Sequence, residues 1–233
     1  MLTYLDPSLP EQPFPKVKHA LKDPDGLIAV GGCLSPERLI NAYKHGIFPW
    51  YSPGDPILWW SPDPRLCLLP NQFKPSKSLQ RLARKNNFTV RIDQSFNTVI
   101  KACAMPRKTQ DKTWISPEMI NAYQTLHNIG VAHSIEVYRK NTLVGGLYGL
   151  GIGQVFFGES MFHTESNTSK LAFYFLIEKL CEWNYQLIDC QVKSEHLINW
   201  GAQELPRDGF IALVNQYSIK YTAVGAWKKI SYD

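Results

Sequence analysis

Two hydrophobic patterns occur along this chain of 233 residues, and together they indicate a protein of helices and strands. Apolar residues recurring every three or four positions predict amphipathic helices, whereas short runs rich in β-branched and aromatic residues predict strands. The predicted helices cover 35–46, 76–86, 94–104, 116–130 and 169–183, with Ser35 and Asp93 as expected N-caps. The predicted strands cover 88–92, 133–138, 143–150, 154–158 and 186–191. This order predicts an α+β fold with a mixed, largely antiparallel sheet.

The first part of the chain differs in texture from the rest. Residues 1–64 hold eleven of the sixteen prolines, and residues 48–64 read FPWYSPGDPILWWSPDP. Interleaved prolines and aromatics predict extended segments, with a turn at 52–55. We therefore expect a small N-terminal domain over 1–64 and a larger domain over 65–233.

Composition and charge exclude several classes of protein. A hydrophobic content of 44% with 19% charged residues is ordinary for a globular protein. No apolar run approaches the roughly 18–20 residues needed to span a membrane, and the N-terminus lacks the pattern of a secretory signal. Five cysteines without a Cys-x-x-Cys pair and six histidines without ligand spacing argue against disulfides and metal, and favour the cytoplasm. The net charge of +5 is compatible with a polyanionic partner but common in proteins without one. No heptad pattern suggests assembly, so a monomer is expected.

Residues 145–162 combine glycines, apolar residues and a single charge. The segment reads GGLYGLGIGQVFFGESMF, and Glu159 is its only charged residue. A carboxylate in apolar surroundings is costly unless a cation or hydrogen-bond donors meet it. The segment could therefore bind a small molecule with an ammonium and a hydrocarbon side chain, such as an amino acid. Alternatively, the glycines serve close packing and Glu159 pairs with an interior Lys or Arg.

A second polar group lies at the end of the last predicted strand, in Ile188-Asp189-Cys190-Gln191. Side chains alternate across a strand, so Asp189 and Gln191 are expected on one face and Cys190 on the other. This placement argues against a cysteine nucleophile that works with them. Asp189 could fix the Gln191 amide, act as a general base, or simply cap a helix that begins near Ser194.

Basic and aromatic residues suggest contacts to a nucleic acid. The spacing of five basic residues around a predicted helix places them on one face: Lys74, Lys77, Arg81, Arg84 and Lys85. The face could bind phosphates, helped by Arg107, Lys108 and Lys112, or could simply be solvated. Trp50, Trp59, Trp60 and Trp114 favour packing as a group, although Trp114, in a loop before a helix, is the better candidate for stacking on a base.

Several segments together resemble the bacterial leucyl/phenylalanyl-tRNA–protein transferases. They occur in order over most of the chain: HGIFPWYSPGDPILWWSPDPR (45–65), TWI (113–115), AHSIEV (132–137), LVGGLYGL (143–150), VFFGESMF (155–162), IDCQ (188–191) and HLINWGAQELPR (196–207). The resemblance implies transfer of leucine or phenylalanine, with methionine as a further candidate, from aminoacyl-tRNA to a protein with N-terminal Arg or Lys, which marks that protein for degradation. It also implies an acetyltransferase-like (GNAT) second domain and no cofactor. The family usually has Asp at Cys33 and often Met at Leu147.

The resemblance also implies roles for the residues singled out above. Asp189 and Gln191 would be catalytic. Trp50 and Trp114 would stack on the terminal adenosine, and the five basic residues would contact tRNA phosphates. The aminoacyl group would be bound by Glu159, Met161, Leu147, Phe173 and Ile188.

Two other functions remain as alternatives. An acetyl-CoA N-acetyltransferase would need a glycine-containing loop between a strand and a helix to bind pyrophosphate. The corresponding residues 162–170 (FHTESNTSK) contain no glycine. A non-catalytic RNA-binding module would explain the basic residues but not Asp189, Gln191 and Glu159.

Overall fold

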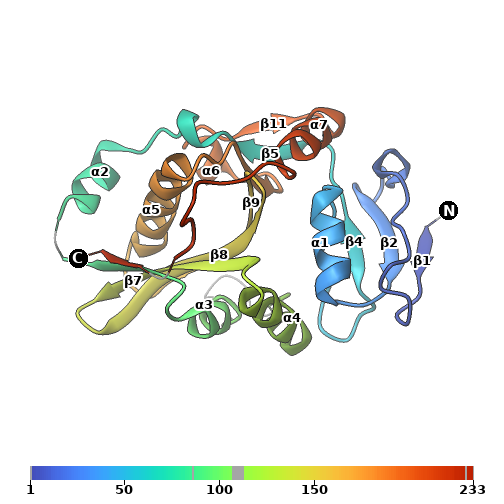
Figure 1. Cartoon of the computed structure of the whole chain (residues 1–233), viewed down its shortest axis with the longest axis horizontal. Helices are drawn as coiled ribbons and strands as arrows, with labels where there is room; N and C mark the ends of the chain where they lie inside the picture. Colours follow the sequence, from blue (N-terminus) through green and yellow to red (C-terminus); the bar gives the residue numbers. More distant parts are fainter. Residues whose placement is uncertain (1, 86, 107–112, 229, 233) are drawn as a thin grey trace.

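A computed structural model of the chain describes residues 2–85, 87–106, 113–228 and 230–232. The described chain forms two β-sheets with helices packed around them (Figure 1). No described helix is long and apolar enough to cross a membrane.

The smaller sheet is built from the N-terminal part of the chain. Its strand order is β1-β2-β4-β3, with β1 and β2 parallel and the other pairs antiparallel. The expected turn at 52–55 is present, with the Asp55 N–H donating to the Ser52 carbonyl at 3.0 Å. Helix α1 (Pro36–Lys44) lies between this sheet and α4 (Pro117–Asn128), as Figure 1 shows. The strands are β1 (Thr3–Leu5), β2 (Leu27–Gly31), β3 (Phe48–Pro49) and β4 (Leu58–Trp60).

The larger sheet has eight strands in the order β11-β5-β10-β9-β8-β7-β6-β12. Neighbouring strands are antiparallel except for β9 and β10, which are parallel. The predicted α+β class and mixed, largely antiparallel sheet are confirmed. The strands are β5 (Arg65–Leu68), β6 (Thr89–Ile92), β7 (Ala132–Arg139), β8 (Thr142–Ile152), β9 (Val155–His163), β10 (Leu187–Gln191), β11 (Gln203–Leu205) and β12 (Ile230–Tyr232).

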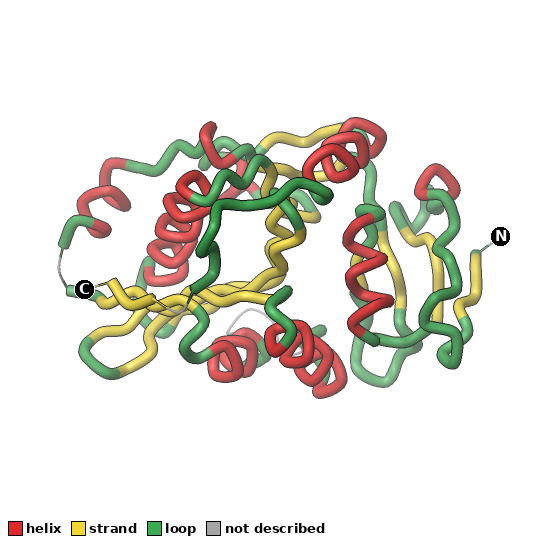
Figure 2. The backbone as a smooth tube through the Cα atoms, in the orientation of Figure 1, coloured by secondary structure: helices red, strands yellow, loops and turns green. Residues whose placement is uncertain are grey.

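Helices cover both faces of the larger sheet (Figure 2). Helix α5 (Thr168–Glu182) packs on β7, β8 and β9 from one side and also contacts α2 (Lys77–Ala83). Helix α3 (Phe96–Cys103) packs on the same strands from the other side, next to α4. The short helix α6 (Glu195–Ile198) follows β10, and α7 (Arg207–Tyr217) contacts β5 and β10. The core on the α3–α4 side continues into the smaller sheet, so the two parts of the chain share buried apolar contacts.

Helix starts follow the sequence closely. The side chains of Ser35, Ser76 and Ser116 each accept a hydrogen bond from the backbone N–H three residues later, which satisfies a donor that the helix itself leaves free. The predicted Asp93 cap is wrong. Its carboxylate instead accepts from the His133 ring at 2.7 Å and the Ser134 N–H at 2.7 Å, which tie it to β7.

Several elements differ from the predicted pattern. Helix α2 is shorter than predicted and ends at Ala83, so Lys74 and Lys85 lie outside it. Strand β9 continues to His163, because residues 160–163 pair with β8. Glu159 falls at the register shift between the Ser160 and Gly158 pairs and is skipped in the pairing. The elements that were not predicted are strands β1, β2, β5, β11 and β12 and helix α7. The change from the smaller to the larger sheet falls between Trp60 and Arg65.

Candidate active site

A cavity of about 340 Å³ lies where β8, β9 and β10 meet α5 and the N-terminal part of the chain. All seven residues predicted to be catalytic or to bind an aminoacyl group line it, and so do Trp50 and Trp114. The sequence segments that suggested an amino-acid pocket and a polar strand end therefore form one site. The remaining lining residues are Phe48, Pro49, Tyr148, Phe156, Gly158, Ser160, Leu176, Cys190, Val192 and Leu197.

One wall of the cavity is apolar. Leu147 on β8 pairs directly with Met161 on β9, and Ile188 comes from β10 two strands away. Phe173 of α5 packs above them, with its ring 5.1 Å from that of Trp200. Side chains alternate across a strand, so the cavity-facing positions 147 and 161 lie on the α5 face of the sheet. This wall can hold a branched or aromatic hydrocarbon.

Glycines let the strands beside this wall come close. At Gly149 the pairing of β8 with β9 shifts register, and a Cβ there would collide with the Phe157 carbonyl oxygen. At Gly145 a Cβ would collide with the side chain of Thr168, whose hydroxyl donates to the Val144 carbonyl at 2.7 Å. The expected close approach of the backbone at these glycines is thus present.

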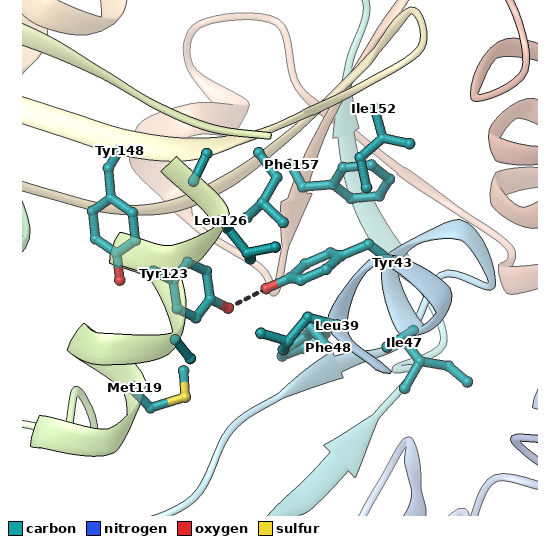
Figure 3. Packing of buried hydrophobic residues seen from close by; sticks show 14 of the residues in the cluster. Leu39, Tyr43, Ile47, Phe48, Met119, Tyr123, Leu126, Tyr148, Ile152 and Phe157 are labelled. Atoms are coloured by element: carbon teal, nitrogen blue, oxygen red, sulfur yellow. Dashed lines mark hydrogen bonds between the residues drawn. The ribbon is translucent and has the colours of Figure 1, made fainter. Parts of the chain in front are cut away.

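Glu159 is held by hydrogen bonds from three different elements. Its Oε1 accepts from the Tyr43 hydroxyl at 2.7 Å and from Gln191 Nε2 at 2.9 Å, and its Oε2 accepts from the Tyr123 hydroxyl at 3.0 Å. The two tyrosine hydroxyls also contact each other, as Figure 3 shows. The alternative in which Glu159 pairs with an interior Lys or Arg is wrong for the described residues, where its partners are neutral donors.

The electrostatics of Glu159 follow from these neighbours. Burial raises the pKa of Glu159 to about 7, while the hydrogen bonds from Tyr43 and Tyr123 oppose the rise and the nearby Asp189 charge adds to it. Burial and the Glu159 carboxylate raise the pKa of both tyrosines, so they remain protonated donors. The carboxylate is partly exposed to the cavity, so it can meet a ligand ammonium.

Asp189 is arranged differently from Glu159. Its two oxygens accept from Arg65 Nε at 2.8 Å and Nη2 at 2.7 Å, and both side chains are fully buried. Its Oδ1 also accepts from the backbone N–H of Gln191 at 2.9 Å. The expectation that Asp189 fixes the Gln191 side-chain amide is therefore wrong. Glu159 accepts from that amide, whereas Asp189 accepts from the backbone N–H of Gln191. Its alternative role as a cap for α6 is also not seen among the described residues, because its oxygens accept from Arg65 and from the Gln191 N–H, which lie outside that helix.

The expected alternation at the end of β10, with Asp189 and Gln191 on one face and Cys190 on the other, is not observed. The pairing with β5 shifts between Asp189 and Gln191, and Gln191 has a left-handed φ of 63°. A bulge of this kind inserts one extra residue and redirects the side chains after it. Cys190 consequently lines the cavity too. Burial raises the pKa of the Cys190 thiol far above its ordinary value, which argues against a thiolate nucleophile.

The predicted nucleic-acid contacts lie at the cavity and on the surface. The Trp50 side chain is 45% exposed, and Trp114 is half-buried in the loop before α4. Trp59 is buried in the core, whereas the Trp60 ring packs edge-on against Trp50. The five basic residues from Lys74 to Lys85 are exposed, although only three of them lie on or cap α2. Arg107, Lys108 and Lys112 lie outside the described residues.

Sequence reasoning missed the partners of the two carboxylates. Tyr43 comes from α1, Tyr123 from α4 and Arg65 from β5. A lone carboxylate in an apolar segment signals that donors must exist, but no local spacing says which residues supply them. Long-range packing brings these three side chains to the site.

Two family models match the chain. The model for leucyl/phenylalanyl-tRNA protein transferase matches residues 67–215, and the model for the N-terminal domain of the same enzymes matches residues 32–63. The chain belongs to the leucyl/phenylalanyl-tRNA protein transferase family.

Relatives in this transferase family are similar over nearly the whole chain. The leucyl/phenylalanyl-tRNA–protein transferase of Methylococcus capsulatus is 49% identical over 233 residues, which covers 100% of this chain and 99% of the relative. That of Nitrosomonas europaea is 52% identical over 206 residues, covering 88% and 87%. That of Azotobacter vinelandii is 55% identical over 197 residues, covering 84% and 87%.

Some solved structures align with this transferase at low similarity. FemX aligns with a TM-score of 0.48 and 12% identity, covering 78% of this chain and 71% of that one. A GCN5-related N-acetyltransferase from Kribbella flavida aligns with a TM-score of 0.37 and 11% identity, covering 72% and 60%. Likeness at this level supports no conclusion about this chain.

Proposed function

We propose that the cavity holds the aminoacyl end of a charged tRNA and that the residues around Gln191 present the acceptor amine to it. The chain is an aminoacyltransferase that transfers leucine or phenylalanine from aminoacyl-tRNA to the N-termini of proteins. The observation that carries the proposal is that one cavity is lined by an apolar wall, by the hydrogen-bonded carboxylate of Glu159 and by the exposed indole of Trp50.

The donor side chain occupies the apolar wall. Leu147, Met161, Phe173 and Ile188 surround a slot that suits a side chain with an unbranched Cβ and bulk further out, as in leucine, phenylalanine and methionine. Isoleucine and valine branch at Cβ and would crowd its mouth. Shape alone discriminates by about 1–3 kcal/mol per methylene, so the exclusion is graded. Glu159, when ionised, binds the donor's α-ammonium.

The donor ester already carries the free energy for the reaction. The acceptor nitrogen attacks the ester carbonyl carbon, a C–N bond forms, and the bond to the ribose oxygen breaks. The amine loses one proton, and the leaving ribose oxygen ends with one. Neither ATP nor an enzyme nucleophile is needed. A protein α-amine has a pKa of about 7.7–8.0, so part of it is neutral near pH 7.

Asp189 and Gln191 organise this step. Because Gln191 Nε2 donates to Glu159, its Oε1 is left to accept from the acceptor amine. The donor α-ammonium on Glu159 and the acceptor amine on Gln191 would then lie side by side, as transfer requires. We expect Asp189→Ala to lose transfer while Leu-tRNA binding, measured by filter retention, is kept. Transfer at the wild-type rate would contradict the assignment.

The tRNA itself is held outside the cavity. Trp50 and Trp114 stack on the terminal adenosine, and Lys74, Lys77, Arg81, Arg84 and Lys85 contact phosphates of the acceptor stem. Phosphate contacts carry little sequence information, so different leucine tRNAs should all serve. The exposure of all five basic residues supports this role.

The acceptor, cellular context and organisation are part of the same proposal. We propose that the acceptor is a protein with N-terminal Arg or Lys and that the added residue marks it for degradation. We further propose a cytoplasmic monomer that needs no cofactor and divides into domains at residues 64 and 65. The change of sheet between Trp60 and Arg65 supports this division.

A transfer assay tests the function against its alternatives. Purified protein is incubated with radiolabelled Leu-tRNA or acetyl-CoA and with a peptide that begins with Arg. We expect leucine to appear on the peptide N-terminus and no acetyl group to appear. Acetyl transfer would support an acetyltransferase, and tRNA binding without any transfer would support an RNA-binding module.

A further inference from the structure

The buried ion pair between Arg65 and Asp189 combines two hydrogen bonds with contacts to two aromatic rings. The Arg65 guanidinium lies between the rings of Phe48 and Phe210, 4.6 Å from each centroid, and donates two parallel hydrogen bonds to Asp189. Both side chains are fully buried, and Arg65 Nη1 has no hydrogen-bond partner within the described parts of the chain. A buried ion pair is often no more stabilising than an apolar pair of similar volume. Fold stability alone is therefore a poor reason for this arrangement.

The pair has a direct geometric consequence at the cavity. Asp189 Oδ1, which accepts from Arg65 Nε, also accepts from the backbone N–H of Gln191 at 2.9 Å. Gln191 has a left-handed φ of 63°. This conformation is unfavourable for most residues other than glycine, so the surrounding structure must stabilise it. The β10 bulge lies between these two residues. The Asp189 carboxylate, oriented by Arg65, therefore stabilises the backbone turn at Gln191. From this turn the Gln191 side chain reaches Glu159.

From this geometry we infer that Arg65 is a positioning residue for the transfer reaction, acting through Asp189 on the backbone of Gln191. Asp189 then serves as a fixed anion and does not take the acceptor's proton. Its two oxygens are occupied by Arg65 and by the Gln191 N–H. Phe48, which covers one face of the guanidinium, also lines the cavity, so the N-terminal part of the chain takes part in this positioning. The inference rests on the proposed function.

The test is a double-mutant cycle on leucyl transfer to a peptide beginning with Arg. Arg65→Gln leaves a buried carboxylate without its cation, and we expect kcat to fall about 100-fold, as when a reacting group is misplaced by about 1 Å. The Kd for Leu-tRNA should change much less than kcat, because the contacts of Arg65 are to Asp189, Phe48 and Phe210, and none of these is proposed to bind the aminoacyl group.

The double variant Arg65→Gln/Asp189→Asn decides between positioning and proton transfer. The two new amides can pair with each other, and the one at position 189 still accepts from the Gln191 N–H. We expect kcat of the double variant to exceed that of either single variant, by about tenfold, since coupled neighbours are strongly non-additive. A double variant no more active than Asp189→Asn alone would overturn the inference, because a proton acceptor cannot be replaced by an amide.

Two further variants keep the test independent of folding. Arg38 is also fully buried and lies over an aromatic ring, 5.1 Å from the Phe14 centroid, but no part of it lines the cavity. Arg38→Gln should lower the melting temperature and leave kcat of the folded protein unchanged.

If Arg65→Gln does not fold, Arg65→Lys replaces it, since lysine keeps the charge but loses the bidentate contact to Asp189. Wild-type kcat in Arg65→Lys would overturn the inference. A wild-type protein that transfers no leucine would overturn the proposed function itself, and this inference with it.

Discussion

At the scale of single residues, the site depends on two carboxylates kept in different states. Asp189 is paired with a guanidinium, whereas the partners of Glu159 among the described residues are neutral donors. Burial therefore raises the pKa of Glu159 to about 7, close to the pKa expected for the amines it would meet. A carboxylate with a pKa in this range would be ionised more readily if an ammonium were bound beside it.

Replacing Glu159 by glutamine should change how stability depends on pH. The folded-state pKa of about 7 lies above the ordinary value of 4.5, so ionisation costs the folded protein free energy as pH rises from 4.5 through 7. Glutamine does not titrate, and Glu159→Gln should gain stability relative to wild type over this window. Because Glu159 is partly exposed, we expect a gain on the order of 1 kcal/mol, or about 2–4 °C in Tm.

Thermal melts of both proteins at pH 5 and pH 8 check this expectation. The exposed Glu195 gives the matched control, Glu195→Gln, for which no such trend is expected. In transfer assays at pH 8, Glu159→Gln should raise KM for Leu-tRNA more than KM for the acceptor peptide. A Tm difference that is the same at both pH values, or an unchanged donor KM, would contradict the role of Glu159.

At the scale of elements, the sequence predicts most of the large sheet and its helices. Apolar periodicity and serine caps are local signals, so α1, α4, α5 and strands β6–β8 lie close to their predicted ranges. The bulge in β10 is not visible in the pattern, because it is enforced by the hydrogen bond of Asp189 and by the shifted pairing with β5. The same holds for the Tyr43 and Tyr123 contacts to Glu159, which depend on the packing of α1 against α4.

Helix α2 offers a prediction for tRNA binding. Lys77 and Arg81 are exposed and one helical turn apart, so both can contact the same phosphate backbone. Lys77→Ala and Arg81→Ala should each weaken binding of Leu-tRNA and lower the slope of log K against log salt by about 1. Lys101→Ala, an exposed lysine on α3 across the sheet, is the matched control and should change neither quantity. A slope that is unchanged in both α2 variants would refute the phosphate contacts.

At the scale of the whole molecule, the site is shared between the two parts of the chain. Phe48, Pro49 and Trp50 of the smaller sheet region line the cavity, and Tyr43 of α1 binds Glu159. Figure 3 shows Tyr43 and Tyr123 meeting from opposite sides within one continuous core. The N-terminal part thus contributes residues to the candidate site.

Tyr43→Phe tests this shared construction. The substitution keeps the ring and removes one hydrogen bond that holds down the pKa of Glu159. The pKa of Glu159 should then rise, so the pH below which donor use declines should move upward. A net hydrogen bond to a charged group contributes about 1.5–3 kcal/mol, so we expect KM for Leu-tRNA to increase about tenfold or more near pH 7. The pH profile of kcat/KM for Leu-tRNA measures both effects, and an unshifted profile would contradict the contribution of α1.

The most direct measurement of the central claim is a crystal structure with phenylalanine joined by an amide bond to 3′-aminoadenosine, a stable mimic of the charged tRNA end. We expect the phenyl ring to lie against Leu147, Met161 and Phe173, with the α-amine within hydrogen-bond distance of Glu159. The adenine should stack on Trp50 or Trp114. A phenyl ring bound outside this wall, or an α-amine directed away from Glu159, would contradict the account.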